Sequence, residues 1–130
     1  MPHGQGRMVY QTGVIFEGEW KDGWECRGIY TDPGKFVYEG EMEDGIAHGQ
    51  GKLTFANGGY YEGGHKKGAF HGNGVYFYAD KDDKDRRREG VWKDDKFYTG
   101  IEYRFGDKLY YEEGVYVLSP GTRKRMEESK

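Results

Sequence analysis

The chain has 130 residues, a length typical of a single domain. Leu, Ile, Val and Phe make up fewer than a fifth of it, but a net charge of only −3 argues against the disorder that such a composition otherwise indicates. With 12 Tyr and 3 Trp, the core is expected to consist mainly of aromatic rings. The balance of 20 basic and 23 acidic residues excludes a strongly basic nucleic-acid-binding domain, so no nucleic acid is expected as a partner.

The compartment is predicted from what the sequence lacks. The single cysteine, Cys26, cannot form an internal disulfide, and the first ten residues hold no apolar segment of a signal peptide. No apolar run approaches the roughly 18 residues of a membrane-spanning helix. We therefore expect a cytoplasmic protein, although an exported form cleaved before this start would have the same sequence.

The chain opens in the second half of a repeat and then runs through complete copies. Residues 3–13 begin with HGQG, a motif that returns as HGQG at 48–51 and as HGNG at 71–74. Each of four complete units begins with a related segment: FEGEWKDG (16–23), YEGEMEDG (38–45), YEGGHKKG (61–68) and REGVWKDD (88–95). The units are predicted to span 16–37, 38–60, 61–87 and 88–109, followed by a partial unit at 110–118 and a polar tail at 119–130. We expect this tail to be either a short capping helix or disordered.

Each unit is predicted to fold as a β-hairpin. Large side chains alternate with Glu and Gly, as in FEGEW at 16–20, and residues two apart share one strand face. Turn signals such as Asp-Gly at 22–23 separate the strands, and recurrent glycine argues against helices. We expect an all-β, elongated single-layer antiparallel sheet of about ten strands, in which rings pack into gaps left by glycines. The glycines expected to serve this packing are Gly18, Gly40, Gly49, Gly51, Gly63, Gly72, Gly74 and Gly90.

The order Y-E-G-E-W, then D/N-G, then H-G-x-G over about 23 residues resembles the MORN (membrane occupation and recognition nexus) repeat. The resemblance covers residues 3–118. It implies a twisted sheet with an aromatic-lined groove and a role as a cytoskeletal or ciliary scaffold, a membrane-junction protein, or an accessory segment of a kinase or methyltransferase. None of those catalytic domains is found in these 130 residues.

Units one and four depart from the pattern. Unit four has Arg88 at the aromatic position, Asp95 at the turn glycine, and Thr99 and Ile101 at the glycines of H-G-x-G. We expect units one and four to lose this second glycine pair, and the inward face of unit four to continue through Ile101, Tyr103 and Phe105. Residues 78–89 are an insertion with balanced charges, predicted to be a solvated loop.

The aromatic face is the favoured functional site. A single-layer sheet cannot cover both faces, so some rings should remain exposed, and exposed Trp and Tyr often bind partners. The rings expected to line a groove are Phe16, Trp20, Tyr38, Tyr61, Tyr76, Tyr78 and Trp92. We expect a protein partner, from the cytoskeleton, the cilium or a motor. The open sheet edges would also permit two copies to pair as a homodimer.

The alternative interpretation is a peripheral membrane protein. Two basic triplets could contact acidic headgroups, each charge adding about 1 kcal/mol near the membrane surface. They are Arg86, Arg87 and Arg88, and Arg123, Lys124 and Arg125. Acidic residues flank both triplets, which is also typical of ordinary solvated charge.

No metal or cofactor is expected. His3, Cys26, His48 and His71 occupy equivalent positions of the repeat. Equivalent residues of successive hairpins lie two strands apart, about 9–10 Å. Zinc needs its ligand atoms within ~2.0–2.3 Å of one centre. We therefore predict structural roles for these side chains.

Catalysis is not favoured either. The glutamates Glu17, Glu39, Glu62 and Glu89 form a ladder with a spacing suited to a pair of catalytic carboxyls. Repeat symmetry, however, distinguishes no acid from its base. We expect these side chains to lie on the solvated face or to accept hydrogen bonds from adjacent backbone, and we predict that the chain is not an enzyme.

Overall fold

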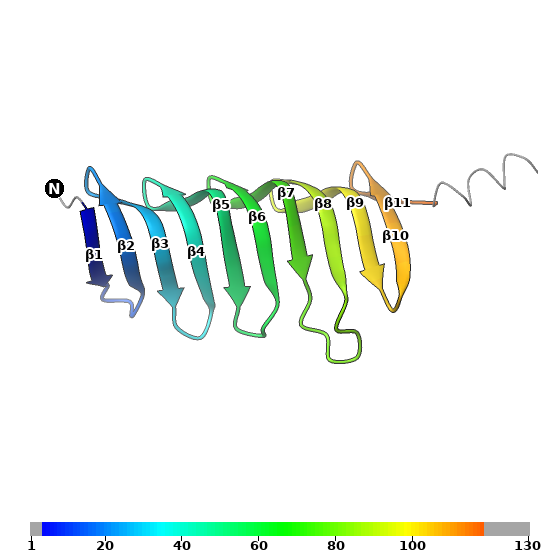
Figure 1. The fold of residues 1–130 in the computed structure, drawn as a ribbon, viewed down its shortest axis with the longest axis horizontal. Coiled ribbons are helices and arrows are strands. Elements are labelled where there is room, and N and C mark those ends of the chain that lie inside the picture. The colour runs from blue at the N-terminus through cyan, green and yellow to red at the C-terminus, as the bar shows by residue number, and fades with distance from the viewer. Residues whose placement is uncertain (1–3, 119–130) are drawn as a thin grey trace, which may run out of the picture.

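The computed structural model describes residues 4–118, which form one antiparallel sheet of eleven strands in chain order (Figure 1). The strands are β1 (Gly4–Val9), β2 (Ile15–Lys21), β3 (Trp24–Asp32), β4 (Phe36–Glu43), β5 (Ile46–Phe55), β6 (Tyr60–Lys66), β7 (Ala69–Phe77), β8 (Arg87–Lys93), β9 (Lys96–Arg104), β10 (Asp107–Glu112) and β11 (Val115–Val117). No helix occurs within 4–118. The predicted all-β array of stacked hairpins is confirmed, and the polar tail lies outside the described residues.

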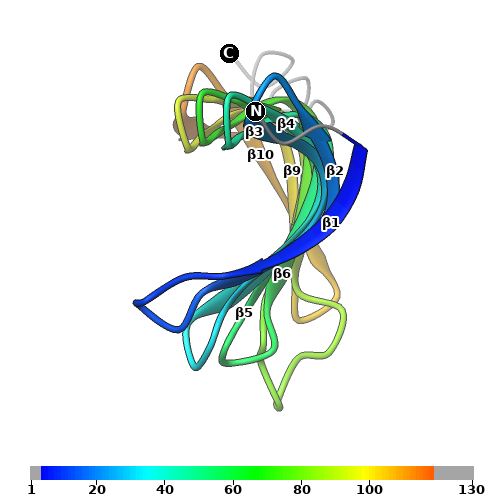
Figure 2. The ribbon, with the colours of Figure 1, turned by 90° about the vertical axis from the view of Figure 1, so that its left-hand side faces the viewer.

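The sheet is bent into a trough. Viewed along its long axis, the strands curve so that the turns at both ends lean toward the same side (Figure 2). In β2, buried Phe16 and Trp20 alternate with exposed Glu17 and Glu19. The same alternation places the aromatic side chains of the core on one face, which we call the inner face, whereas Tyr60 and Phe77 stack on each other on the outer face. Curvature toward the inner face lets a single layer bury a core.

A row of glycines crosses nine strands in register. Its members are Gly6, Gly18, Gly28, Gly40, Gly51, Gly63, Gly74, Gly90 and Gly100. In the central units a tyrosine lies over this row: a Cβ at Gly51 would come within 2.2 Å of the Tyr38 hydroxyl oxygen, and a Cβ at Gly74 equally close to that of Tyr61. Any side chain there would displace the ring.

The units differ in the length of the bulge that follows the glycine row. In unit two, the register passes from Gly40 opposite Gly51 to Met42 opposite Ala47, so β5 holds two extra residues, and unit three repeats this. In units one and four the second strand holds one extra residue at the equivalent place. The H-G-x-G motif therefore accompanies the longer bulge.

The shorter bulge moves the second-strand glycine one position earlier. Gly28 faces Gly18 in unit one, and Gly100 faces its partner Gly90 in unit four. Units one and four therefore lack both glycines of H-G-x-G but still place a glycine, Gly28 or Gly100, in the row across the sheet. The predicted inward face of unit four is wrong, because Glu102 lies on the inner face at 1% exposure, while Ile101 lies on the opposite face.

The core consists of two clusters along the trough. The first is built from Phe16, Trp20, Tyr38 and Met42, with Tyr10, Tyr30, Ala47 and Leu53 packed against it. The second is built from Tyr61, Trp92 and Phe97, with Phe70, Tyr76 and Tyr111 packed against it. The expectation of a core dominated by aromatic rings is confirmed.

The insertion between β7 and β8 is more ordered than a solvated loop. Asp83 is buried, and its Oδ2 accepts a hydrogen bond from the Phe105 backbone N–H at 2.5 Å. The Arg86 guanidinium lies 4.2 Å from the centroid of the Tyr78 ring. The insertion is thereby attached to the turn between β9 and β10.

Candidate binding groove

One row of side chains crosses the inner face beside the glycines. It contains Phe16, Tyr30, Tyr38, Leu53, Tyr61, Tyr76, Arg88 and Glu102, each opposite the next across a strand pair. The row is apolar or aromatic as far as Tyr76 on β7. Beyond Tyr76 the row consists of the charged residues Arg88 and Glu102. The Arg88 Nε–H donates a hydrogen bond to Glu102 Oε1 at 2.5 Å.

Most of the predicted groove rings lie in the core. Those that are buried are Phe16, Trp20, Tyr38, Tyr61 and Trp92. Tyr76 and Tyr78 are half-buried, with ring centroids 4.8 Å apart. Phe16, Trp20 and Tyr38 belong to the first cluster, and Tyr61 and Trp92 to the second. The rings thus pack mainly on one another and leave only parts of their faces to a ligand.

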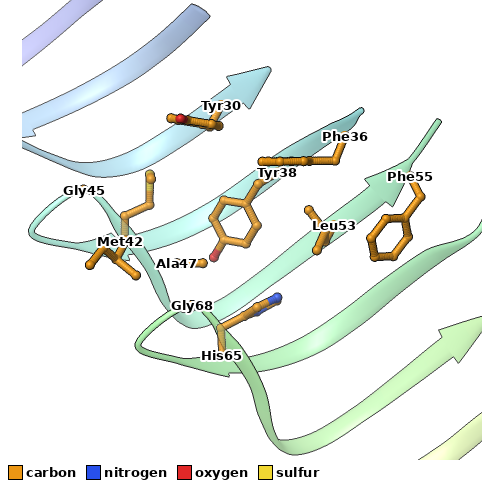
Figure 3. A pocket seen from close by; sticks show the side chains of 11 residues that line it. Tyr30, Phe36, Tyr38, Met42, Gly45, Ala47, Leu53, Phe55, His65 and Gly68 are labelled. Atoms are coloured by element: carbon orange, nitrogen blue, oxygen red, sulfur yellow. The ribbon is translucent and has the colours of Figure 1, made fainter. Parts of the chain in front are cut away.

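An open cavity of about 440 Å³ lies on the inner face over β3–β6, and we call it the central cavity. It is lined by Tyr30, Phe36, Tyr38, Met42, Gly45, Ile46, Ala47, Leu53, Phe55, His65 and Gly68. Figure 3 shows Tyr38, Leu53 and Phe55 arranged around it from neighbouring strands. Its lining includes no Lys, Arg, Asp or Glu.

Burial keeps the polar side chains of this region neutral. The hydroxyl of Tyr38 donates to the Glu41 carbonyl at 2.5 Å, and burial raises the pKa of Tyr38 to about 12. Burial also lowers the pKa of His65, whose Nδ1 lies 3.2 Å from the Gly63 carbonyl oxygen. The wall of the central cavity is therefore uncharged at neutral pH.

A second cavity, of about 720 Å³, adjoins the central one, and Tyr30, Gly45 and Ile46 line both. We call it the N-terminal cavity, and the two together the groove. The remaining residues that line the N-terminal cavity are Tyr10, Gln11, Thr12, Val14, Trp24, Glu25 and Asp44. Trp24 and Ile46 stand at its rim with 54% and 51% of their surface exposed.

Several lining residues were missed by reasoning from the sequence. Phe36 and the second-strand residues Tyr30, Leu53 and Phe55 line the central cavity but were not among the rings expected there. The sequence does contain a feature that could have indicated the rim residues. Trp24 and Ile46 each directly follow a turn glycine, at a position where the later units have Ala69 and Lys96. Together, Trp24 and Ile46 add exposed apolar surface to the rim of one cavity, and such contiguous surface is typical of an interaction site.

The arginine triplet does not form a free cationic surface. Arg86 pairs with Asp80 at 3.6 Å, and Arg87 pairs with Glu89 at 2.7 Å. Arg88 lies on the inner face with Glu102, on the opposite side of β8 from Arg87, because successive strand residues alternate. The second triplet, Arg123, Lys124 and Arg125, lies outside the described residues.

The histidine and cysteine positions stay apart. His48 Nε2 lies 3.3 Å from Glu43 Oε2, and Cys26 Sγ lies 3.5 Å from the Glu19 carbonyl oxygen. Across residues 4–118, no group of three or more His, Cys, Asp or Glu side chains is close enough to hold a metal ion. His3 lies outside these residues.

The glutamate ladder lies on the outer face. Glu17, Glu39 and Glu62 are exposed there, and Glu89 is half-exposed. Glu39 and Glu62 both stand opposite Lys52, which separates the two carboxylates. This arrangement matches the expected position on the solvated face.

The sequence matches the MORN repeat at residues 1–15, 16–34, 38–60 and 61–83. A comparison with curated proteins finds no match. Within the described part of the chain, no helix has the length and apolar character needed to cross a membrane. MORN repeats are commonly protein- or membrane-interaction modules and are generally non-catalytic. The hairpin geometry, with its glycine pair, continues in β8 and β9 beyond the matched segments. With more than half of its residues matched and a sheet built from the same hairpin throughout, the chain belongs to the MORN repeat family.

Proposed function

We propose that this protein is a non-catalytic interaction module that binds a protein partner in the groove. The observation that carries the proposal is the central cavity, which is open, apolar and uncharged on the inner face of the sheet. Filling such a cavity removes apolar surface from water, and each Å² removed contributes about 25 cal/mol.

The shape of the groove fits a segment of polypeptide. The two cavities adjoin across β3–β5, so one segment can place successive side chains in both. Trp24 and Ile46 would then pack against the segment from the rim. Exposed aromatic and apolar residues beside a pocket are typical binding hot spots.

A membrane surface is a less favoured ligand. In the first of the two basic triplets, Arg86, Arg87 and Arg88 each pair with a carboxylate, and the residues that line the groove include Glu25 and Asp44 but no Lys or Arg. Acidic headgroups would be repelled by such a groove. A peptide has no such restriction.

Selection of peptides from a display library against the immobilised full chain tests the proposal. The affinity of an enriched peptide is then measured by fluorescence polarisation for the wild type, Ile46→Glu and Val37→Glu. Ile46 lines both cavities, whereas Val37 is an exposed apolar residue of the outer face. We expect Ile46→Glu to weaken binding at least tenfold and Val37→Glu to leave it unchanged.

Two outcomes would overturn the proposal. One is equal affinity in both variants, which would place the ligand elsewhere. The other is that no peptide is enriched while the chain pellets with phosphatidylserine vesicles in a salt-sensitive way, which would identify a membrane surface as the ligand.

A further inference from the structure

Glu25 is a carboxylate at a position that the other units fill with apolar residues. Its equivalents beside the hairpin turn are Ala47, Phe70 and Phe97. Only 7% of the Glu25 surface is exposed. A charge buried at a core position costs free energy unless it is paired, so a break of the local pattern here indicates a functional reason.

The described residues give the Glu25 carboxylate a phenol as its hydrogen-bond partner. Glu25 Oε1 accepts a hydrogen bond from the Tyr10 hydroxyl, and the ion pairs formed within residues 4–118 do not include Glu25. Burial, followed by the bond to Glu25, raises the pKa of Tyr10 to about 12. Burial, followed by the charges of Asp32 and Glu25, raises the pKa of Tyr30. Two neutral phenols therefore lie near a carboxylate that forms no ion pair within the described part of the chain.

The surroundings of Glu25 favour a cation from outside. Trp24, Tyr10 and Tyr30 line the same cavity, and the faces of aromatic rings attract Lys and Arg. A smaller hollow that also contains Glu25 is lined by the acidic residues Asp22, Glu43 and Asp44, with Lys21 as its single base. The N-terminal end of the groove is thus acidic, whereas the central cavity is uncharged.

We propose that the groove selects partner segments in which a lysine or arginine follows or precedes an apolar anchor. The anchor fills the central cavity, and the cation enters the N-terminal cavity and pairs with Glu25. This inference rests on the proposed function, because it names the class of segment that the groove accepts. A buried carboxylate without a cation is unfavourable in the free protein. Pairing it with a cation of the partner offsets that cost and favours binding.

The selected peptides supply the test. We expect enrichment of Lys and Arg at a fixed distance from an apolar residue. A synthetic peptide with this basic residue should bind the wild type at least tenfold more tightly than its analogue with Gln at that position. In Glu25→Gln this difference should disappear, because Gln keeps an acceptor for Tyr10 but carries no charge. The matched control is Glu17→Gln, which removes the same charge from the outer face and should retain the preference.

Salt and stability separate a charge effect from a folding effect. Affinity of the wild type for the basic peptide should fall as salt rises, and that of Glu25→Gln should fall much less. Circular dichroism melting should give Glu25→Gln a Tm no lower than the wild type. If the basic peptide and its Gln analogue bind the wild type equally while Ile46→Glu still weakens binding at least tenfold, this inference fails and the proposed function stands. A preference that persists in Glu25→Gln also overturns it. If no peptide is enriched and the chain pellets with phosphatidylserine vesicles in a salt-sensitive way, both fail.

Discussion

Units three and four hold two different inner faces on the same backbone. In unit three, Tyr61 lies over the glycine row and stacks on Phe70 with ring centroids 3.8 Å apart. In unit four, Arg88 occupies the equivalent position and pairs with Glu102. Both units keep a pair of facing glycines. The hairpin lattice therefore depends on glycines and turns, whereas the row beside them tolerates either rings or an ion pair.

The two units also fill the glycine gap from different strands. A Cβ at Gly74 would meet the ring of Tyr61 from the first strand. A Cβ at Gly100 would meet Cζ of Phe97, at 2.9 Å, from the second strand. Because Phe97 fills the glycine gap in unit four, the residue at position 88 does not have to cover it, and Arg88 can pair with the carboxylate of Glu102. The glycine gap is thus filled by residues at different positions of the repeat.

The largest expected effect comes from breaking the ion pair of unit four. Arg88→Leu leaves Glu102 buried without its cation, so we expect the free energy of unfolding to fall by about 3 kcal/mol or more. Urea unfolding measures this. The double variant Arg88→Tyr, Glu102→Leu recreates the pair found in unit two, where Tyr38 faces Leu53. It should recover most of the loss. A double variant less stable than Arg88→Leu would contradict the idea that the row accepts either chemistry.

The next effect tests the glycine row itself. Gly74→Ala places a methyl group against the Tyr61 ring, so we expect overpacking to lower the free energy of unfolding by about 2–3 kcal/mol. Gly106→Ala is the matched control, because a Cβ there meets nothing within 4 Å and only the positive φ of 82° is unfavourable. Its loss should be about 1 kcal/mol. Equal losses in urea unfolding would argue that the Tyr61 ring moves aside for the methyl group at little cost, because Gly74 has no positive φ.

The smallest effect concerns the phenol that unit four lacks. Tyr61→Phe removes the hydrogen bond from the hydroxyl to the Gly64 carbonyl at 2.8 Å, at a cost of about 1 kcal/mol near neutral pH. Burial, followed by the charge of Asp95, raises the pKa of Tyr61 from 10.0 to about 12. The unfolded state therefore ionises first, so this contribution to stability is complete below pH 10 and is lost as the pH rises toward 12.

Urea unfolding of the wild type and Tyr61→Phe at pH 8, 10 and 11.5 measures the difference. The wild type should lose more stability than the variant over this range. Parallel losses would show that Tyr61 does not contribute to the alkaline sensitivity of the fold.

The candidate site was only partly accessible from the sequence. The aromatic face was found, because alternation along a strand assigns residues to faces. The groove itself was not, since five of the seven rings expected to line it are buried against other rings. Which parts of a ring remain open depends on neighbouring strands, and Leu53 or Phe55 line the central cavity because of where β4 and β6 place their partners. The role proposed for Glu25 likewise depends on its burial and its hydrogen-bond partner, which the sequence does not show.

The sequence by itself determined the hairpin repeat, its turns and its order along the sheet. These features depend on residues close together in the chain: a period of two, Asp-Gly turns, and a glycine in each strand of the first four units. Only the tertiary structure decided the bulge lengths. The bulge of unit four in turn decides that Glu102, rather than Ile101 or Tyr103, faces inward. A bulge is defined by pairing between strands, and a shift of one residue exchanges the two faces of a strand. The ion pair of Arg88 and Glu102 and the two adjoining cavities follow from that pairing.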